Sequence, residues 1–282
     1  MKNLQDTFVL NNGVRVPVIG FGTWLMPDEE TTVEIIDDAI RDGYRHIDTA
    51  EYYKNEKSIG EAVKKSGLKR EDLFITSKVW NTDSGYDKTM AAFERTLKNL
   101  GTDYLDLYLI HWPAVAAQYD NWEEINLDTW RALTDLYKAG KVRAIGVSNF
   151  LPHHLEALMK TEVPPMVDQI EFHPGNMQKD TLEYCRNHNI QVEAWSPLGR
   201  GRVLSDPELQ KIADKYGKSV SQLCIRWALQ NGVIPLPKSV TPSRIQQNAD
   251  VFDFEISQED MNTINSMPDF GGSGLDPDHP KF

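Results

Sequence analysis

The sequence predicts an α/β fold, a single (β/α)8 TIM barrel spanning residues 1–282 as one domain. Eight short apolar segments alternate with segments whose apolar residues recur at helical spacing, which is typical of parallel strands joined by helical crossovers. Several strand segments, such as LDLYLI at 105–110, are apolar nearly throughout, as expected of strands buried on both faces. The 282 residues suit one barrel, since single barrels run to roughly 250 residues.

The first expected element is a β-hairpin over residues 7–17. Its sequence, TFVLNNGVRVP, places Asn12-Gly13 between two short apolar runs, and Asn-Gly is a strong local signal for a hairpin. The eight strands of the barrel follow, and helices separate them. These strands are predicted at residues 18–22, 45–48, 73–79, 105–110, 144–147, 166–170, 191–195 and 233–236.

The helices are predicted from their start and stop signals. Asp28, followed by two glutamates, is expected to open the first helix, and Pro152 suits the first position of a later one. Further helix starts are expected at Asp206-Pro207, Ser219 and Thr241-Pro242. Glycines just past the last turn are expected to end four helices. These glycines are Gly43, Gly67, Gly101 and Gly140.

A doubly wound sheet with a dinucleotide-binding turn is the main alternative fold. It requires a GxGxxG turn between its first strand and helix. The candidate GFGTWL at 20–25 lacks the third glycine, and GGSG at 271–274 lies in an irregular tail. No Pro- or Gly-rich linker divides the chain, so the barrel is preferred.

Composition limits the classes of partner. The chain has 30 Lys and Arg against 42 Asp and Glu, a net charge of −12, which disfavours a broad nucleic-acid or anionic-membrane surface. No apolar run approaches the length of a membrane span, and the first residues lack the apolar core of a signal peptide. Cys185 and Cys224 are expected to be buried, reduced thiols. We therefore expect a cytoplasmic protein, and a monomer.

Polar or aromatic residues end seven of the predicted strands. In a barrel the carboxyl ends of the strands meet at one mouth, where functional groups gather. Any one of these residues could be an ordinary half-exposed strand end, but seven in register favour a site. They are Asp48, Lys78, His111, Ser148 with Asn149, Gln169, Trp195 and Lys238.

Three of the side chains suggest proton transfer. Lys78 and Asp48 could form a purely structural ion pair, yet Tyr53 follows Asp48 by five residues. A nearby ammonium favours the phenolate and would move the pKa of Tyr53 from about 10 toward neutrality by roughly one to three units. Such a shift suits general acid catalysis.

Lys238, Ser239 and Arg244 suggest an anion site near the last strand. Lys238 and Ser239 end that strand, and Arg244 lies in the first turns of the helix that starts at Thr241-Pro242. A helix N-terminus carries partial positive charge, and arginine can bind a phosphate through two hydrogen bonds. The alternative is a solvated surface with no ligand.

Seven motifs along nearly the whole chain resemble those of the aldo-keto reductase family. They are GFGTW at 20–24, DTAEYYKNE at 48–56, ITSKVW at 75–80, DLYLIHWP at 106–113, GVSNF at 146–150, DQIEFHP at 168–174 and PKSVTPSRIQQN at 237–248. Bacterial diketogluconate reductases share many of them. The resemblance implies NADPH-dependent reduction of aldehydes and ketones, on a barrel whose bottom is closed by the N-terminal hairpin.

The resemblance also implies residue roles. Tyr53 would give the proton to the substrate carbonyl, Lys78 and Asp48 would tune it, and His111 would orient the carbonyl oxygen. Histidine at this position implies reduction of carbonyls rather than of carbon-carbon double bonds. Trp195 would stack on the nicotinamide. The other cofactor contacts would come from Ser148, Asn149 and Gln169 at the carboxamide, Ser196 and Leu198 in the following loop, Lys238, Ser239 and Arg244 at the 2'-phosphate, and Asn248 at the adenine.

An aromatic substrate pocket is expected above these groups. Such a pocket favours moderate-sized apolar or weakly polar carbonyls, with a sugar-derived ketone as an alternative. The C-terminal tail, residues 268–282, is expected to contribute to it. The aromatic residues are Trp24, Tyr52, Trp80, Trp112 and Trp122.

Two other functions are compatible with the sequence. An NADPH-binding regulatory or sensor subunit could carry the same motifs with little turnover. Glu171 and His173 could belong to a metallohydrolase, although no second ligand cluster supports it. His153 and His154 are adjacent on a helix, so they are expected to diverge and to form no metal site.

Overall fold

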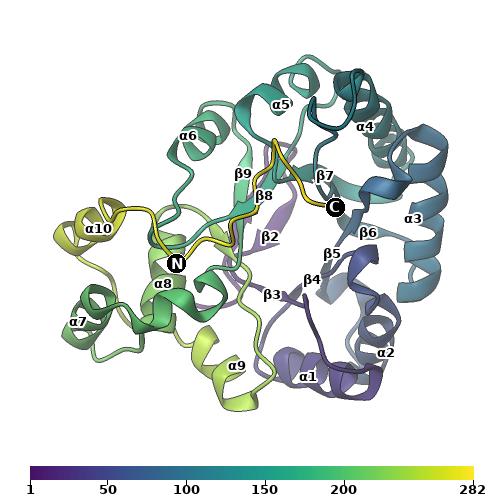
Figure 1. Ribbon diagram of the computed structural model, residues 1–282. Coiled ribbons are helices and arrows are strands. Elements are labelled where there is room, and N and C mark those ends of the chain that lie inside the picture. The colour runs from purple at the N-terminus through teal and green to yellow at the C-terminus, as the bar shows by residue number, and fades with distance from the viewer.

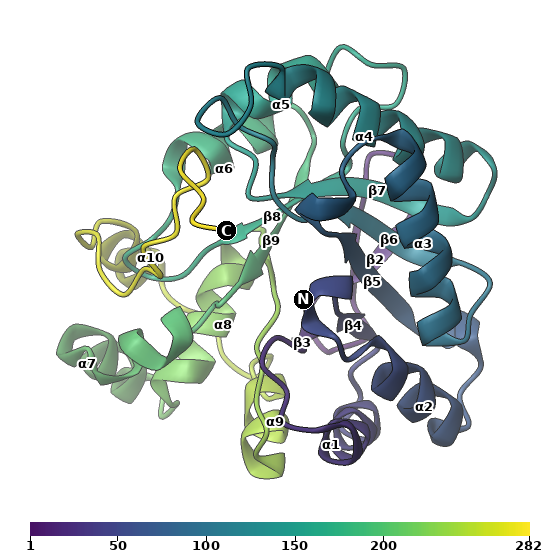
Figure 2. The same cartoon turned by 45° about the vertical axis from the view of Figure 1, so that its right-hand side comes forward.

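The computed structural model describes residues 1–282 and has at its centre an eight-stranded parallel sheet rolled into a nearly closed barrel (Figure 1). Helices form a ring outside the strands in both views (Figures 1 and 2). Sequence neighbours are spatial neighbours throughout, so the prediction of a (β/α)8 barrel is confirmed. The strands are β3 (Gly20–Gly22), β4 (His46–Asp48), β5 (Phe74–Val79), β6 (Leu105–Ile110), β7 (Val142–Ser148), β8 (Val167–Glu171), β9 (Gln191–Trp195) and β10 (Ile234–Pro235).

The helices begin where the capping signals lie. The Asp28 carboxylate accepts from the Thr31 backbone N–H at 2.8 Å, and prolines occupy the first turns of α5, α7 and α9. Gly67 and Gly101 end α2 and α3 with φ of 70° and 64°. The helices are α1 (Glu29–Arg41), α2 (Glu56–Ser66), α3 (Tyr86–Leu100), α4 (Trp122–Lys138), α5 (Pro152–Leu158), α6 (Lys179–Asn187), α7 (Pro207–Lys215), α8 (Val220–Gln230), α9 (Pro242–Ala249) and α10 (Gln258–Asn265), with short 3-10 helices η1 (Glu51–Tyr53), η2 (Arg70–Asp72), η3 (Asn81–Asp83) and η4 (Gly199–Ser205).

The barrel closes where β3 meets the end of β10. The Gly22 N–H donates to the Pro237 carbonyl at 3.1 Å. A Cβ on Gly20 would lie 2.4 Å from the Leu236 side chain, and one on Gly22 would lie 2.8 Å from the Leu236 carbonyl. The two glycines therefore allow an approach that a larger residue would block. Strand β10 spans only Ile234–Pro235, shorter than the predicted 233–236.

The N-terminal hairpin covers the end of the barrel opposite the functional strand ends. Gly13 takes φ of 85° in its turn. The Asn11 side chain donates to the carbonyls of Pro165 and Asn189, which precede β8 and β9. The predicted hairpin at the barrel bottom is confirmed. Its strands are β1 (Thr7–Val9) and β2 (Arg15–Pro17), paired antiparallel.

A cluster of 64 buried apolar residues packs the sheet against its helices, which holds the strand ends in a rigid frame. Both cysteines, Cys185 and Cys224, are free and buried, as expected. None of the helices combines the length and the apolar character needed to cross a membrane.

The C-terminal tail crosses the mouth of the barrel. In Figure 1 the yellow segment leaves α10 and ends inside the ring of strands. The Phe270 N–H donates to the Gly175 carbonyl at 2.9 Å. Ser273 donates its N–H and its hydroxyl to the Glu171 carboxylate, at 2.8 and 2.7 Å. Glu171, considered above as a metal ligand, therefore anchors the tail.

Candidate active site

A buried ion pair lies at the centre of the mouth. Asp48 ends β4, and Lys78 lies in the adjacent strand β5. The Lys78 ammonium is 2.8 Å from both Asp48 carboxylate oxygens and 2.9 Å from the Thr49 carbonyl. Burial alone would lower the pKa of Lys78, but the charge of Asp48 outweighs it with the help of Tyr53, so that this pKa is raised. Lys78 is therefore a fixed buried cation at neutral pH.

Tyr53 contacts this cation from η1. Its hydroxyl oxygen is 3.5 Å from the Lys78 Nζ, and the same Nζ lies 5.0 Å from the Tyr53 ring centroid. Burial of the hydroxyl raises the pKa of Tyr53, and Lys78, which lowers it, offsets the rise only in part. The prediction that the pKa of Tyr53 moves toward neutrality is therefore wrong for the protein without a bound ligand. Desolvation of the phenolate outweighs the attraction of the Lys78 ammonium, which is already paired with Asp48.

His111 faces Tyr53 across the mouth. The ring lies directly after β6, is 7% exposed, and has its centroid 5.6 Å from that of Tyr53. Burial, and then the charge of Lys78, hold the pKa of His111 well below its ordinary value, so the imidazole is neutral at pH 7. Its Nδ1 is buried without a hydrogen-bond partner. A neutral imidazole can donate a hydrogen bond but has no imidazolium proton to give.

A second layer of polar groups lies beneath the ion pair. The Gln169 side-chain nitrogen donates to Asp48 Oδ1 at 2.8 Å and to Glu193 Oε2 at 2.9 Å. Glu193 and His46 are fully buried. Sequence reasoning missed both in this role, although alternation along β9 pointed to Glu193, which lies two residues before Trp195 and so shares its face of the strand.

Three side chains, those of Ser148, Asn149 and Trp195, form a hydrogen-bonded row beside this layer. Ser148 donates its hydroxyl to the backbone carbonyl of Gln169 at 2.7 Å. The Asn149 side-chain nitrogen donates to the His111 carbonyl and to Ser148 Oγ, both at 3.1 Å, and its oxygen accepts from Trp195 Nε1 at 2.8 Å. The side-chain oxygen of Gln169 accepts no hydrogen bond from the protein. It therefore keeps both lone pairs for an N–H of a ligand, whereas Asn149 Oδ1 and Ser148 Oγ each accept one hydrogen bond within the protein and keep one.

The loop after β9 borders the same row. Ser196, with φ of 48°, and Leu198 are half-buried there, and the Ser196 hydroxyl makes no hydrogen bond within the protein. The Arg200 guanidinium lies 5.7 Å from the Trp195 ring centroid. Trp195 itself is half-buried, so part of its ring is accessible to a flat ligand.

The predicted anion site lies on the rim between β10 and α9. The Lys238 ammonium donates to the Leu25 carbonyl at 2.9 Å. Ser239 is buried, and its hydroxyl accepts from the Thr241 N–H at 3.1 Å. Arg244 is exposed in α9 and forms no ion pair. Asn248, the candidate adenine contact, is buried on the same helix. No carboxylate neutralises these two cations, so the rim offers positive charge to an anionic ligand.

Aromatic rings form a wall above Tyr53 and His111. Trp24 stacks on Tyr52 at 5.5 Å, and Tyr52 stacks on Trp80 at 3.9 Å between centroids. Phe282 of the tail lies 4.8 Å from Trp80 and 5.3 Å from Trp112. Four of the five predicted pocket residues therefore form one wall together with the tail.

Comparison with known proteins shows the family of this chain. A sequence model described as the Aldo/keto reductase family matches residues 18–269. The chain belongs to this family. The reductase is 52% identical over 281 residues to the glyoxal reductase of Bacillus subtilis (strain 168), covering 99% of both chains. It is 41% identical to the methylglyoxal reductase DkgA of Escherichia coli (strain K12), covering 95% and 96%.

A solved structure supports the same assignment. The crystal structure of a mutant of Gox0644 in complex with NADPH matches this reductase with a TM-score of 0.91 at 43% identity, covering 99% of each chain. The predicted family, the fold and an oxidoreductase function are therefore confirmed.

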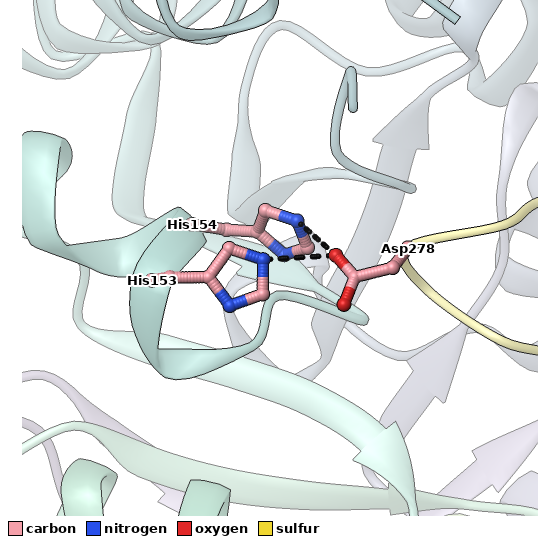
Figure 3. Close-up of side chains that lie close together, drawn as sticks. All are labelled: His153, His154 and Asp278. Carbon is pink, nitrogen blue, oxygen red and sulfur yellow. Dashed lines mark hydrogen bonds and ion pairs between the residues drawn. The ribbon is translucent and has the colours of Figure 1, made fainter. Parts of the chain in front are cut away.

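The fifth pocket residue, Trp122, packs beside three residues that join the tail to α5, which we call the latch: His153, His154 and Asp278. His153 Nε2 lies 2.8 Å and His154 Nε2 3.0 Å from the same Asp278 oxygen (Figure 3). The Trp122 ring lies 5.6 Å from that of His154. The prediction that the two histidines diverge is wrong, because the tail brings a carboxylate to which both rings turn.

Hydrogen bonding argues against a metal ion in this latch. The ligand atoms of the three residues lie within 4.8 Å of one another. However, His154 Nδ1 accepts from the Leu151 N–H at 3.0 Å, so a neutral His154 carries its proton on Nε2. That nitrogen then donates to Asp278 and has no lone pair for a metal.

Proposed function

We propose that this reductase converts aldehydes and ketones to alcohols with NADPH, and that Tyr53 is the general acid. The observation that carries the proposal is the contact between the Tyr53 hydroxyl and the buried Lys78 ammonium, at 3.5 Å. When Tyr53 gives its proton to a carbonyl oxygen, the resulting phenolate lies beside a cation that is already in place. That arrangement stabilises the charge that develops in the transition state.

The protonation states separate the roles of Tyr53 and His111. Tyr53 is protonated at neutral pH, whereas His111 is neutral because its pKa lies well below the usual value. His111 would therefore donate a hydrogen bond to the carbonyl oxygen and orient it. Asp48 would keep Lys78 charged and directed at the phenol, through its two contacts at 2.8 Å.

The donor and acceptor groups of the mouth fit NADPH. The free Gln169 oxygen suits a carboxamide N–H, and the accessible part of Trp195 suits a nicotinamide ring. The unpaired rim cations suit a 2'-phosphate. NADPH supplies a hydride when bound. We assign its contacts to Ser148, Asn149, Gln169, Trp195, Ser196, Leu198, Lys238, Ser239, Arg244 and Asn248.

Small dicarbonyls are the substrates that we propose. The relatives named above act on glyoxal and methylglyoxal by name. In this reductase Phe282 lies against Trp80 and Trp112, so the tail narrows the space above Tyr53. A compact carbonyl fits beneath such a cover better than a bulky one.

The test is NADPH oxidation followed at 340 nm with glyoxal and methylglyoxal. Wild type should turn over, and Tyr53→Phe should lose about 100- to 10,000-fold in kcat, the usual contribution of general acid catalysis. NADPH binding should be nearly unchanged in the variant because the ring is kept. A near-wild-type kcat in Tyr53→Phe would show that Tyr53 is not the general acid. Tight NADPH binding by wild type with no turnover of any carbonyl would instead favour a sensor.

A further inference from the structure

A buried glutamate that the proposed mechanism does not use lies directly beneath the proposed nicotinamide contacts. Glu193 on β9 is the register partner of Gln169 on β8, and it is fully buried. Its Oε2 accepts from the Gln169 side-chain nitrogen at 2.9 Å. Its Oε1 has no hydrogen-bond partner and lies 3.9 Å from His46 Nε2. An acidic side chain at such a depth needs a specific explanation.

The contacts of Gln169 fix which end of its amide faces the barrel. Its nitrogen meets two carboxyl groups, Asp48 at 2.8 Å and Glu193 at 2.9 Å. The opposite orientation would place the amide oxygen against the ionised Asp48, which is repulsive. With both N–H groups used, the oxygen must point away from the two acids. It is the end that accepts no hydrogen bond from the protein.

We propose that Glu193 is a positioning residue for the cofactor: together with Asp48 it holds the Gln169 amide so that its oxygen accepts an N–H of the nicotinamide carboxamide. This inference rests on the proposed use of NADPH. Asp48 alone would leave the amide one anchor, about which it could rotate. The second anchor from the neighbouring strand removes that freedom before the cofactor arrives, and preorganisation of this kind reduces the entropy lost on binding.

The protonation of Glu193 is consistent with this role. Burial, and then the charge of Asp48, raise the pKa of Glu193 to about 8, so the side chain carries a proton at neutral pH. A protonated acid still offers its carbonyl oxygen to Gln169. It adds no second negative charge beside Asp48, which would otherwise compete for Lys78. Glutamine has the same shape and the same acceptor as this protonated acid.

The experiment compares two ligands in three proteins. The ligands are NADP+ and its 3-acetylpyridine analogue, in which a methyl group replaces the carboxamide NH2. The proteins are wild type, Glu193→Leu, which removes the acceptor at similar volume, and Glu193→Gln, which keeps it. Dissociation constants are measured by quenching of tryptophan fluorescence. Thermal melting of each protein monitors folding.

Wild type should bind NADP+ more tightly than the analogue. In Glu193→Leu the ratio of the two dissociation constants should fall by about three- to tenfold, the usual contribution of one hydrogen bond. The whole change should come from weaker binding of NADP+. Glu193→Gln should restore the preference. An unchanged preference in Glu193→Leu, or equal weakening of both ligands, would overturn the inference. Failure of wild type to bind NADP+ at all would contradict the proposed function instead.

Discussion

Two aspartates of the mouth each hold a pair of nitrogen donors, yet their surroundings differ. Asp48 has a side chain that is 5% exposed, and it accepts from Lys78 and Gln169 inside the barrel. Asp278 has a side chain that is 39% exposed, and it accepts from His153 and His154 on the rim. The first group lies on strands of the barrel, and the second joins the tail to a helix.

The difference shows how one chemical pattern can serve two ends. A buried charge must be paired and fully hydrogen-bonded, because water cannot replace a lost partner. An exposed carboxylate can lose its partners to water at little cost. The interior group is therefore suited to fix a charge for catalysis, and the rim group is suited to hold a segment that can detach.

The largest expected effect is the contrast in stability between these two aspartates. Asp48→Asn should lower the free energy of unfolding by about 3–5 kcal/mol, because it leaves the buried Lys78 ammonium without its counter-charge. Asp278→Asn, the same chemical change at the rim, should cost less than about 1 kcal/mol. Urea unfolding at pH 7, followed by circular dichroism, measures both. Equal losses would mean that burial does not separate the two sites.

A smaller effect is expected at the rim cations, which should act on a ligand rather than on stability. Arg244→Ala should weaken NADPH binding by about ten- to a hundredfold, since a charge-assisted hydrogen bond contributes about 1.5–3 kcal/mol. NADH lacks the 2'-phosphate and should be unaffected. Both dissociation constants can be measured by tryptophan fluorescence.

Arg131→Ala is the matched control for this prediction, because Arg131 is an exposed arginine of α4 whose contacts are an ion pair with Asp128 and the face of the Tyr86 ring. It should leave both cofactors bound as in wild type. If Arg244→Ala weakens NADPH and NADH alike, then Arg244 supports the adenine or the fold, and the phosphate site must be abandoned.

Local signals in the sequence predicted most of the fold. The strand bounds at 105–110 and 191–195 and the helix starts at Pro152 and Pro207 match the structure. Each depends on neighbours within a few residues, through burial of alternate side chains or capping of the first turn. The seven predicted strand-end groups also meet at one mouth, because parallel strands of a barrel must end together.

Contacts between distant segments could not be predicted in this way. His153 and His154 converge because Asp278 lies against them, more than 120 positions along the chain. Glu193 matters only because β8 places Gln169 opposite it. The pKa of Tyr53 reflects a balance between desolvation and one ammonium, and the depth of the hydroxyl decides that balance.

The latch should also make the stability of the reductase depend on pH, through His154. Burial, and then the charge of His153, lower the pKa of His154 to about 4, below the ordinary 6.5. Between these values the unfolded chain binds more protons than the folded one, so stability falls as pH falls through this window. His154→Gln keeps a capping residue without titrating. Between pH 7 and 5 the free energy of unfolding, measured with urea, should fall by about 2 kcal/mol less in this variant than in wild type. If the free energy of unfolding depends on pH in the same way in both proteins, the prediction is wrong.

The smallest expected effect concerns substrate size. Asp278→Ala should free the tail and move Phe282 away from Trp80 and Trp112, which opens the pocket to larger carbonyls. The ratio of kcat/KM for 4-nitrobenzaldehyde to that for glyoxal should rise by about two- to tenfold, the range expected for losing one or two hydrogen bonds. Phe282→Ala should raise the same ratio. Because both changes act through one segment, Asp278→Ala should add nothing in the Phe282→Ala background, whereas independent sites would give additive effects. Additive effects of the two changes on this ratio would show that the latch does not hold Phe282 over the pocket.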